Sequence, residues 1–286
     1  MVSISKRRTP NRSRFGDLTN ILVLIGFAAF MALPLVFAVN NAFKPLEELF
    51  QFPPRFLVRN PTLDNVRDLF ALMNASWVPF TRYMFNTVFI TLIGTVFHII
   101  VASMAAYVLA KHQFPGKNLF FNIVIMALMF SPHVTAIPNY LIMSRLGWVD
   151  TYNALVVPAI AAPLGVFLMK QFMEQIPVSL LESARIDGAN EFIVFFRVAM
   201  PLVKPAWLTL LIFSFQGLWN LDGGTFVYSE ELKTLPTALQ QIVATGFSRA
   251  GAASAIALFM MIVPLVVFII SQNNVIETMS TSGIKE

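Results

Sequence analysis

Six apolar runs alternate with polar connections along this chain. They cover residues 20–39, 84–110, 119–143, 154–172, 206–220 and 251–273. An α-helix rises about 1.5 Å per residue, so roughly 20 apolar residues cross the hydrocarbon core of a membrane. The pattern therefore predicts an all-α integral membrane protein in which residues 20–273 form one domain of six transmembrane helices.

The connection after the fourth run begins with the signals of a short helix. Ser179 and Glu182 have the spacing of a capping box, so a helix should begin just after Pro177. Asp187 and Gly188 form a turn signal, because glycine permits a positive φ and the Asp side chain can cap the helix that follows. The pattern predicts a helix that ends in a tight turn.

A second amphipathic helix is expected over residues 190–199, where Phe192 and two further phenylalanines lie close together. Pro201 and Pro205 then close the segment. The whole connection, residues 173–205, should form a helix-turn-helix on one surface of the membrane.

Composition and charge support this interpretation and orient it. The chain is 57% hydrophobic, has a mean hydropathy of +0.70 and contains 28 Phe, which is too apolar for an ordinary soluble domain. Lysine and arginine gather beside the ends of the runs and favour the cytoplasmic side. These residues are Lys6, Arg7, Arg8, Arg12, Arg14, Lys111, Lys117, Lys170, Arg185, Arg197 and Lys204. Both termini and the helix-turn-helix are therefore expected in the cytoplasm.

The two ends of the chain are short and polar. Residues 1–19 form a basic tail, which we interpret as a topology signal attracted to the lipid bilayer rather than as a nucleic-acid binder. The sixth run should end near Gln272, leaving residues 274–286 as a cytoplasmic tail.

The second run carries two signals of helix packing. Ala102, Ala106 and Ala110 repeat every four residues, which lets membrane helices approach closely. His98 is the one potentially charged residue well inside a run. We interpret it as a neutral imidazole bonded to a neighbouring helix, with a substrate-ligand role as the alternative.

Several classes of chemistry are disfavoured by what the runs lack. None of them contains Asp or Glu, whereas ion-coupled transporters normally place carboxylates inside the membrane. The chain has no Cys, and its three His are scattered, so no metal site is expected. It also lacks a G-x-x-x-x-G-K-[ST] loop, so it should not bind ATP itself.

The stretch "LLESARIDGANEFIVFFRVAMPLVKP" resembles the cytoplasmic signature of permease subunits of bacterial ABC importers. That signature is Glu-Ala-Ala, then Asp-Gly three residues later, then a pair of prolines. Ser183 stands here in place of the middle alanine. The segments "FNTVFITL", "AAYVLAKHQFPGKN", "KTLPTALQ" and "NNVIETMSTSGIKE" narrow the resemblance to sugar importers of the maltose-permease type, second-subunit branch.

The resemblance implies one transmembrane half of an ATP-driven, binding-protein-dependent importer in the bacterial inner membrane, working by alternating access. Its implied partners are a homologous second permease that completes a heterodimer, two ATPase subunits and an extracytoplasmic sugar-binding protein. This chain would bind no cofactor and would not be an enzyme, because ATP and Mg belong to the ATPase subunits. The substrate would be an oligosaccharide or glycoside.

Three groups of residues are expected to carry function. In the family the helix-turn-helix seats in a groove on the ATPase, and the matching residues are Glu182, Ser183, Ala184, Asp187, Gly188 and Phe192. Polar and aromatic residues of the fifth run are candidates for the substrate pathway, namely Ser214, Gln216, Trp219 and Asn220. The family's C-terminal tail reaches between the ATPases, so Gly283 and Lys285 are expected to contact them.

Alternatives remain for both function and substrate. A secondary transporter would need a coupling carboxylate in the membrane, and a scaffold subunit would not need the patterned inner loop. An importer of amino acids, peptides or other non-sugar solutes is the nearest alternative. The stretch "LWNLDGGTFVYSEEL" departs from the usual pattern of the branch and leaves the identity of the sugar open.

Overall fold

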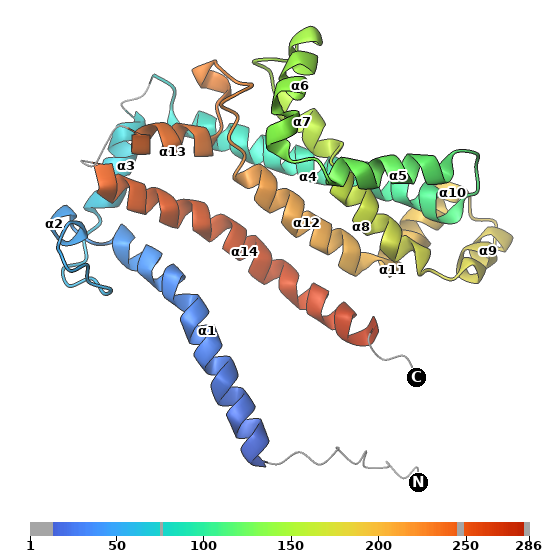
Figure 1. Cartoon of the computed structure of the whole chain (residues 1–286), viewed down its shortest axis with the longest axis horizontal. Helices are drawn as coiled ribbons and strands as arrows, with labels where there is room; N and C mark the ends of the chain where they lie inside the picture. The colour runs from blue at the N-terminus through green and yellow to red at the C-terminus, as the bar shows by residue number, and fades with distance from the viewer. Residues whose placement is uncertain (1–13, 75–76, 245–248, 283–286) are drawn as a thin grey trace.

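A computed structural model describes residues 14–74, 77–244 and 249–282, and the part it describes contains helices and no strands (Figure 1). The elements are α1 (Arg14–Ala42), α2 (Leu46–Leu49), α3 (Asp64–Asn74), α4 (Phe80–Lys111), α5 (Lys117–Leu128), α6 (Pro132–Arg145), α7 (Asn153–Ile160), α8 (Pro163–Glu174), α9 (Val178–Ile186), α10 (Glu191–Ile193), the π-helix η1 (Val194–Ala199), α11 (Met200–Leu202), α12 (Lys204–Trp219), the 3₁₀ turn η2 (Glu230–Leu232), α13 (Leu235–Ala244) and α14 (Ala250–Ser282).

The predicted spans appear as four helical segments and two bent pairs. Residues 16–42, 80–111, 153–174 and 250–271 are each long and apolar enough to cross a membrane. The pairs α5 with α6, and α10–α11 with α12, bring the number of candidate spans to six. The all-α fold is confirmed, and the described residues contain four to six candidate spans, depending on whether each bent pair is one span.

The third run is not one straight helix but two helices with a sharp bend between them. α5 ends at Leu128, α6 begins at Pro132, and the two helices differ in direction by 111°. Proline disfavours a helical conformation in the residue before it, and Ser131 accordingly has an extended ψ of 140°. Ser131 also accepts a hydrogen bond from the amide of His133, so it starts a new helix.

α4 is the central helix, and it packs against α7, α8 and α12 (Figure 1). Ala102 and Ala106 are buried where α4 meets its neighbours, which confirms the predicted close approach. A Cβ atom added to Gly165 of α8 would lie 2.5 Å from His98 Nε2. The His98 ring also bonds the neighbouring helix as predicted, with Nδ1 3.0 Å from the carbonyl oxygen of Ile160.

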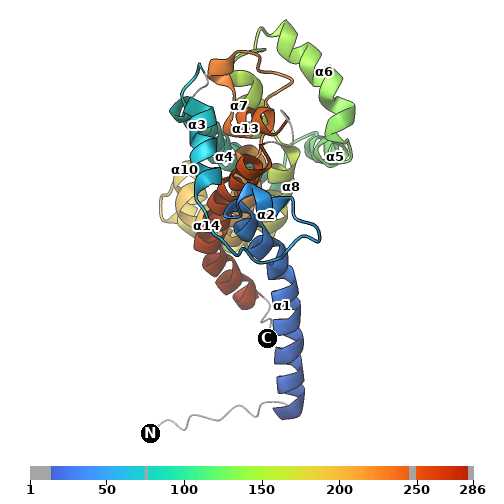
Figure 2. The same cartoon turned by 90° about the vertical axis from the view of Figure 1, so that its left-hand side faces the viewer.

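α1 and α6 project from opposite sides of this body (Figure 2). α1 packs mainly on α14, and most of its apolar side chains are exposed, with Phe30 71% accessible. Such a surface suits contact with lipid or with another membrane subunit.

α14 continues to Ser282, so the predicted helix end near Gln272 is wrong. Residues 273–282 contain neither Pro nor Gly, and nothing in their sequence stops a helix. Gly283 and Lys285, the expected tail contacts, lie outside the described residues.

Candidate coupling and substrate sites

The predicted helix-turn-helix begins as expected, with α9 starting at Val178 directly after Pro177. The capping box is not formed, because Pro177 occupies the N-cap position and Ser179 is already the second residue of the helix. Glu182 therefore does not reach back to an N-cap amide. Its side chain is exposed, with no hydrogen bond to another described residue.

The turn after α9 has the predicted conformation. Gly188 has a φ of +87°, in the left-handed region that side chains with a Cβ rarely adopt. Asp187 does not cap the next helix. Asn190 lies one position before α10, and its Oδ1 accepts a hydrogen bond of 2.9 Å from the amide of Ile193.

The second helix is present, but its centre is a π-helix, η1, flanked by α10 and α11. Of its phenylalanines, Phe195 is buried in the core whereas Phe192 is 67% exposed. π-Helical turns are rare and occur often at functional sites. The amphipathic pattern therefore predicted the position of this element but not its helix type.

The coupling surface consists of the predicted residues that face outward, Glu182, Ser183, Asp187, Gly188 and Phe192. Ala184 is half-buried beneath them. The sequence reasoning missed Ile186, which is 86% exposed beside the turn. An isoleucine inside a polar turn signal was the available clue, because a large aliphatic side chain at such a tip buries nothing within its own chain.

Glu191 joins this surface to the central helix. Its carboxylate accepts hydrogen bonds from Arg185 Nε of α9 at 2.7 Å and from the Tyr107 hydroxyl of α4 at 3.2 Å. His112, just after α4, has Nε2 3.8 Å from the same carboxylate. We call Tyr107, His112, Arg185 and Glu191 the inner hub.

The four predicted pathway residues do not form one site. Ser214 lines a cavity of about 400 Å³ bounded by α4, α6, α7, α12 and the segment after α12. Gln216 and Asn220 line a separate groove between α12 and α14.

Trp219 lines neither space and is only 2% exposed. Its Nε1 donates a hydrogen bond of 3.2 Å to the carbonyl oxygen of Met260. Pro264, four residues further along α14, has no N–H to bond that carbonyl. Trp219 therefore supplies a hydrogen bond to the carbonyl that Pro264 leaves without its helical partner, which is a packing role between α12 and α14.

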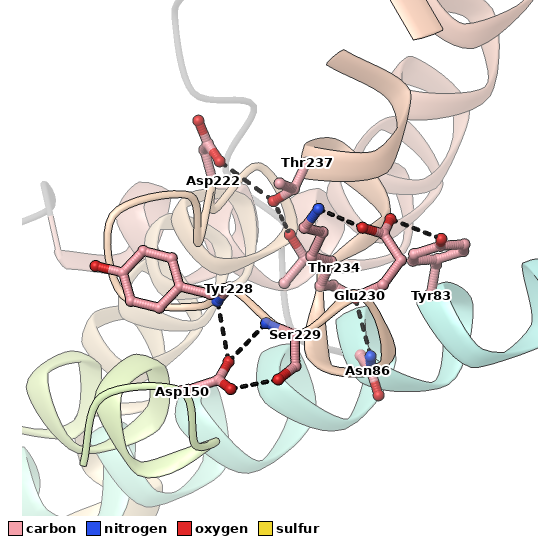
Figure 3. A network of polar contacts seen from close by, with 10 residues as sticks. Tyr83, Asn86, Asp150, Asp222, Tyr228, Ser229, Glu230, Thr234 and Thr237 are labelled. Carbon is pink, nitrogen blue, oxygen red and sulfur yellow. Dashed lines mark hydrogen bonds and ion pairs between the residues drawn. The ribbon is translucent and has the colours of Figure 1, made fainter. Parts of the chain in front are cut away.

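Polar contacts hold the segment after α12 against the N-terminal part of α4, whereas the inner hub lies at the C-terminal end of that helix (Figure 3). Asn86 Nδ2 donates to the carbonyl oxygens of Glu231 and Lys233, at 2.8 and 2.9 Å. Tyr152 donates its hydroxyl proton to Asn86 Oδ1 at 2.7 Å. Thr87 Oγ1 accepts a bond of 2.7 Å from the amide of Leu235.

Asp150 extends this arrangement from the turn before α7 (Figure 3). One of its oxygens accepts hydrogen bonds from the amides of Tyr228 and Ser229, at 2.9 and 2.8 Å, and the other bonds the Ser229 hydroxyl. The hydroxyl and amide of Ser229 lower the pKa of Asp150, because these bonds favour the carboxylate. We call Asn86, Thr87, Tyr152 and Asp150 the outer clamp.

The chain is similar to transporters of known type. Residues 98–280 match the family described as "Binding-protein-dependent transport system inner membrane component". Protein LplC of Bacillus subtilis is 37% identical, over 77% of this chain and 72% of that protein. The arabinooligosaccharides transport system permease protein AraQ of Halalkalibacterium halodurans is 33% identical, over 92% of this chain and 96% of that protein.

Solved structures agree with these relatives. A chain of a bacterial ABC transporter involved in the import of the acidic polysaccharide alginate superposes with a TM-score of 0.75 and 25% identity, covering 93% of this chain and 99% of that chain. Length, span order and fold are therefore shared along nearly the whole protein. The chain is a multi-pass protein of the inner membrane and belongs to the family of binding-protein-dependent transport system inner membrane components.

Proposed function

We propose that this chain is one transmembrane half of an ATP-driven importer of an oligosaccharide or glycoside. Relatives of similar length include AraQ, described as an arabinooligosaccharide permease, and the structural match comes from an importer of alginate. A homologous permease would complete the pore, two ATPase subunits would bind at the cytoplasmic surface, and a binding protein would deliver substrate at the opposite surface. Both termini would be cytoplasmic.

The coupling surface is the observation that carries this proposal. An isoleucine that is 86% exposed, at the tip of a polar turn, has no packing role within the chain. Glycine at a φ of +87° holds the tip in one conformation. An apolar anchor with a polar surround is the usual composition of a protein-binding hot spot.

The inner hub gives this surface a mechanical role. α9 contacts η1, and Glu191 bonds both Arg185 of α9 and Tyr107 of α4. When the ATPases close around nucleotide, displacement of α9 would act on α4 through the hub and on α12 through η1 and α11. Both helices border the cavity that contains Ser214, so its access would change with the nucleotide state.

Copurification tests the proposal. An affinity-tagged chain expressed with its neighbouring transporter subunits should recover an ATPase, and Ile186→Asp should reduce that recovery severalfold, because it places a charge in a desolvated contact. Ser179→Asp is the matched control, since it adds the same charge at the exposed other end of α9. Recovery of ATPase that is equal in both variants, or absent with the wild-type chain, would contradict the proposal.

A further inference from the structure

We propose that the cavity beside Ser214 binds an uncharged, hydroxyl-rich part of the transported saccharide and disfavours carboxylated sugars. This inference rests on the proposed importer function and specifies the substrate class for this half of the pore. Relatives do not decide the point, because AraQ is described as a permease for arabinooligosaccharides and the structural match imports an acidic polysaccharide.

The cavity has the size and wall composition of a small-molecule site. Its volume of about 400 Å³ lies within the roughly 300–1,000 Å³ typical of such sites. Most of its wall is aliphatic or aromatic, including Phe213 and Phe226. The ring of Tyr140 stacks on the ring of Phe226, with 6.3 Å between the two ring centroids. Apolar walls of this kind suit the C–H faces of sugar rings.

Three polar side chains in the wall, besides Asp222, come from three different helices. His98 is 3% exposed and contacts the carbonyl oxygen of Ile160 through Nδ1. Since a carbonyl only accepts, the Nδ1 of His98 donates this hydrogen bond. Asn139 and Ser214 can each donate and accept. A lipid chain in this cavity would leave the side chains of Asn139 and Ser214 without partners there, whereas sugar hydroxyls would satisfy them.

The charge of the cavity favours neutral over acidic sugars. Asp222 lines it, and neither Lys nor Arg is among the lining residues. Asp222 Oδ1 accepts hydrogen bonds from the amide of Gly224 at 2.9 Å and from the hydroxyl of Thr237 at 3.2 Å, which fix the carboxylate in place. No ion pair joins Asp222 to a described Lys or Arg, so its charge would repel a uronate.

Charge-selective labelling tests the cavity without knowledge of the substrate. The chain has no Cys, so Ser214→Cys introduces a unique thiol. In the assembled importer, this thiol is labelled with a cationic ethylammonium or an anionic ethylsulfonate methanethiosulfonate, and modification of this chain is followed by mass. Gln216→Cys, which lies in the groove on the other side of α12, is the matched control.

We expect the cation-to-anion rate ratio to be severalfold higher at position 214 than at position 216, because the carboxylate of Asp222 lines the same cavity as position 214. Adding Asp222→Asn should remove the difference. Equal ratios at the two positions, or no labelling of Ser214→Cys in any nucleotide state, would overturn the proposal. Asn139→Cys probes the same cavity should Ser214→Cys fail to assemble.

Protection by saccharides tests the ligand class. Arabinooligosaccharides or oligogalacturonates are added at equal concentration to the importer with its binding protein, and labelling of Ser214→Cys is measured. Slower labelling with the neutral sugar alone is expected, whereas protection by the uronate, or by neither sugar, would contradict the assignment. Failure of the importer proposal itself would appear separately, as labelling that ATP does not change and as absence of a copurified ATPase.

Discussion

The two ends of α4 are attached to their surroundings in different ways. At the inner end, Tyr107 and Arg185 meet on the carboxylate of Glu191, whose side chain is 50% exposed. At the outer end, Asn86 is fully buried and Thr87 is 1% exposed, and both bond the backbone of residues 231–235. The inner hub is thus ionic and exposed to solvent, whereas Asn86 and Thr87 of the outer clamp are uncharged and buried.

This difference assigns the two ends different mechanical roles. An exposed ion pair contributes about 0–1 kcal/mol, so its geometry can change at little cost. A buried polar group that loses its partner costs about 1–3 kcal/mol. The outer clamp should therefore stay fixed during transport, while the inner hub adjusts as α9 moves.

The largest expected effect is that of Asn86→Leu. It leaves two carbonyl oxygens and the Tyr152 hydroxyl without their partner, at about 1–3 kcal/mol for each group that water cannot reach. The purified complex should unfold several degrees lower than wild type. Asn60→Leu, at an exposed position, is the control. An unchanged midpoint for Asn86→Leu would mean that the clamp does not stabilise the outer end.

Gly188→Val should come next, with coupling affected more than folding. Valine strongly disfavours the φ of +87° at this turn, and a strained residue costs on the order of 1–3 kcal/mol. The ATPase response to the loaded binding protein should fall, while membrane insertion remains. Gly188→Asn should recover much of the response, because asparagine tolerates the left-handed region. A normal response from the valine variant would show that the turn is not a coupling element.

Glu191→Gln should have a smaller effect on stability, within about 1 kcal/mol, because the pair with Arg185 is exposed. A spin label attached to Ile186→Cys should nevertheless become more mobile, since α9 loses its charged link to α4. Glu182→Gln removes a charge from α9 but changes no residue of the inner hub, so it should leave the mobility of the spin label unchanged. Equal mobility in both variants would remove the hub from the coupling path.

The smallest effect is expected from pH at Asp150. Its pKa is lowered in the folded protein by bonds from Ser229, so its stabilising contribution is present above the ordinary value of 3.8 and is lost as pH falls through the lower folded value. The wild-type protein should lose the contacts of Asp150 only in strong acid. Hydrogen exchange of the amides of residues 228 and 229 measures this loss. Asp150→Asn should show weaker protection of these amides already at neutral pH. Identical protection would mean that the carboxylate does not hold this turn.

The sequence predicted the coupling surface better than the outer clamp. The start of α9 after Pro177 and the turn at Gly188 follow from local signals, because proline and glycine restrict or extend the backbone conformations of one or two residues. The outer clamp joins Asn86 to Lys233, which are 147 positions apart, and no local pattern indicates such a contact.

Other differences have equally specific causes. The apolar run of residues 119–143 contains a break at the pair Ser131-Pro132, where the backbone changes direction. The pathway candidates were chosen by residue type, but helical geometry places Ser214 and Gln216 on different sides of α12. The side chain of Trp219 has one polar atom, Nε1, and this atom donates its hydrogen bond to the carbonyl oxygen of Met260, which Pro264 cannot bond.

Site-specific crosslinking at the turn tests the central claim most directly. Ile186→Cys in this cysteine-free chain is crosslinked with a short thiol-to-amine reagent in membranes that contain the assembled importer, with Ser179→Cys as the control. The account predicts an adduct between this chain and the ATPase subunit for Ile186→Cys, with a yield that changes when ATP is added. Absence of that adduct, or a yield equal to that of Ser179→Cys and insensitive to ATP, would contradict the assignment of this surface to coupling.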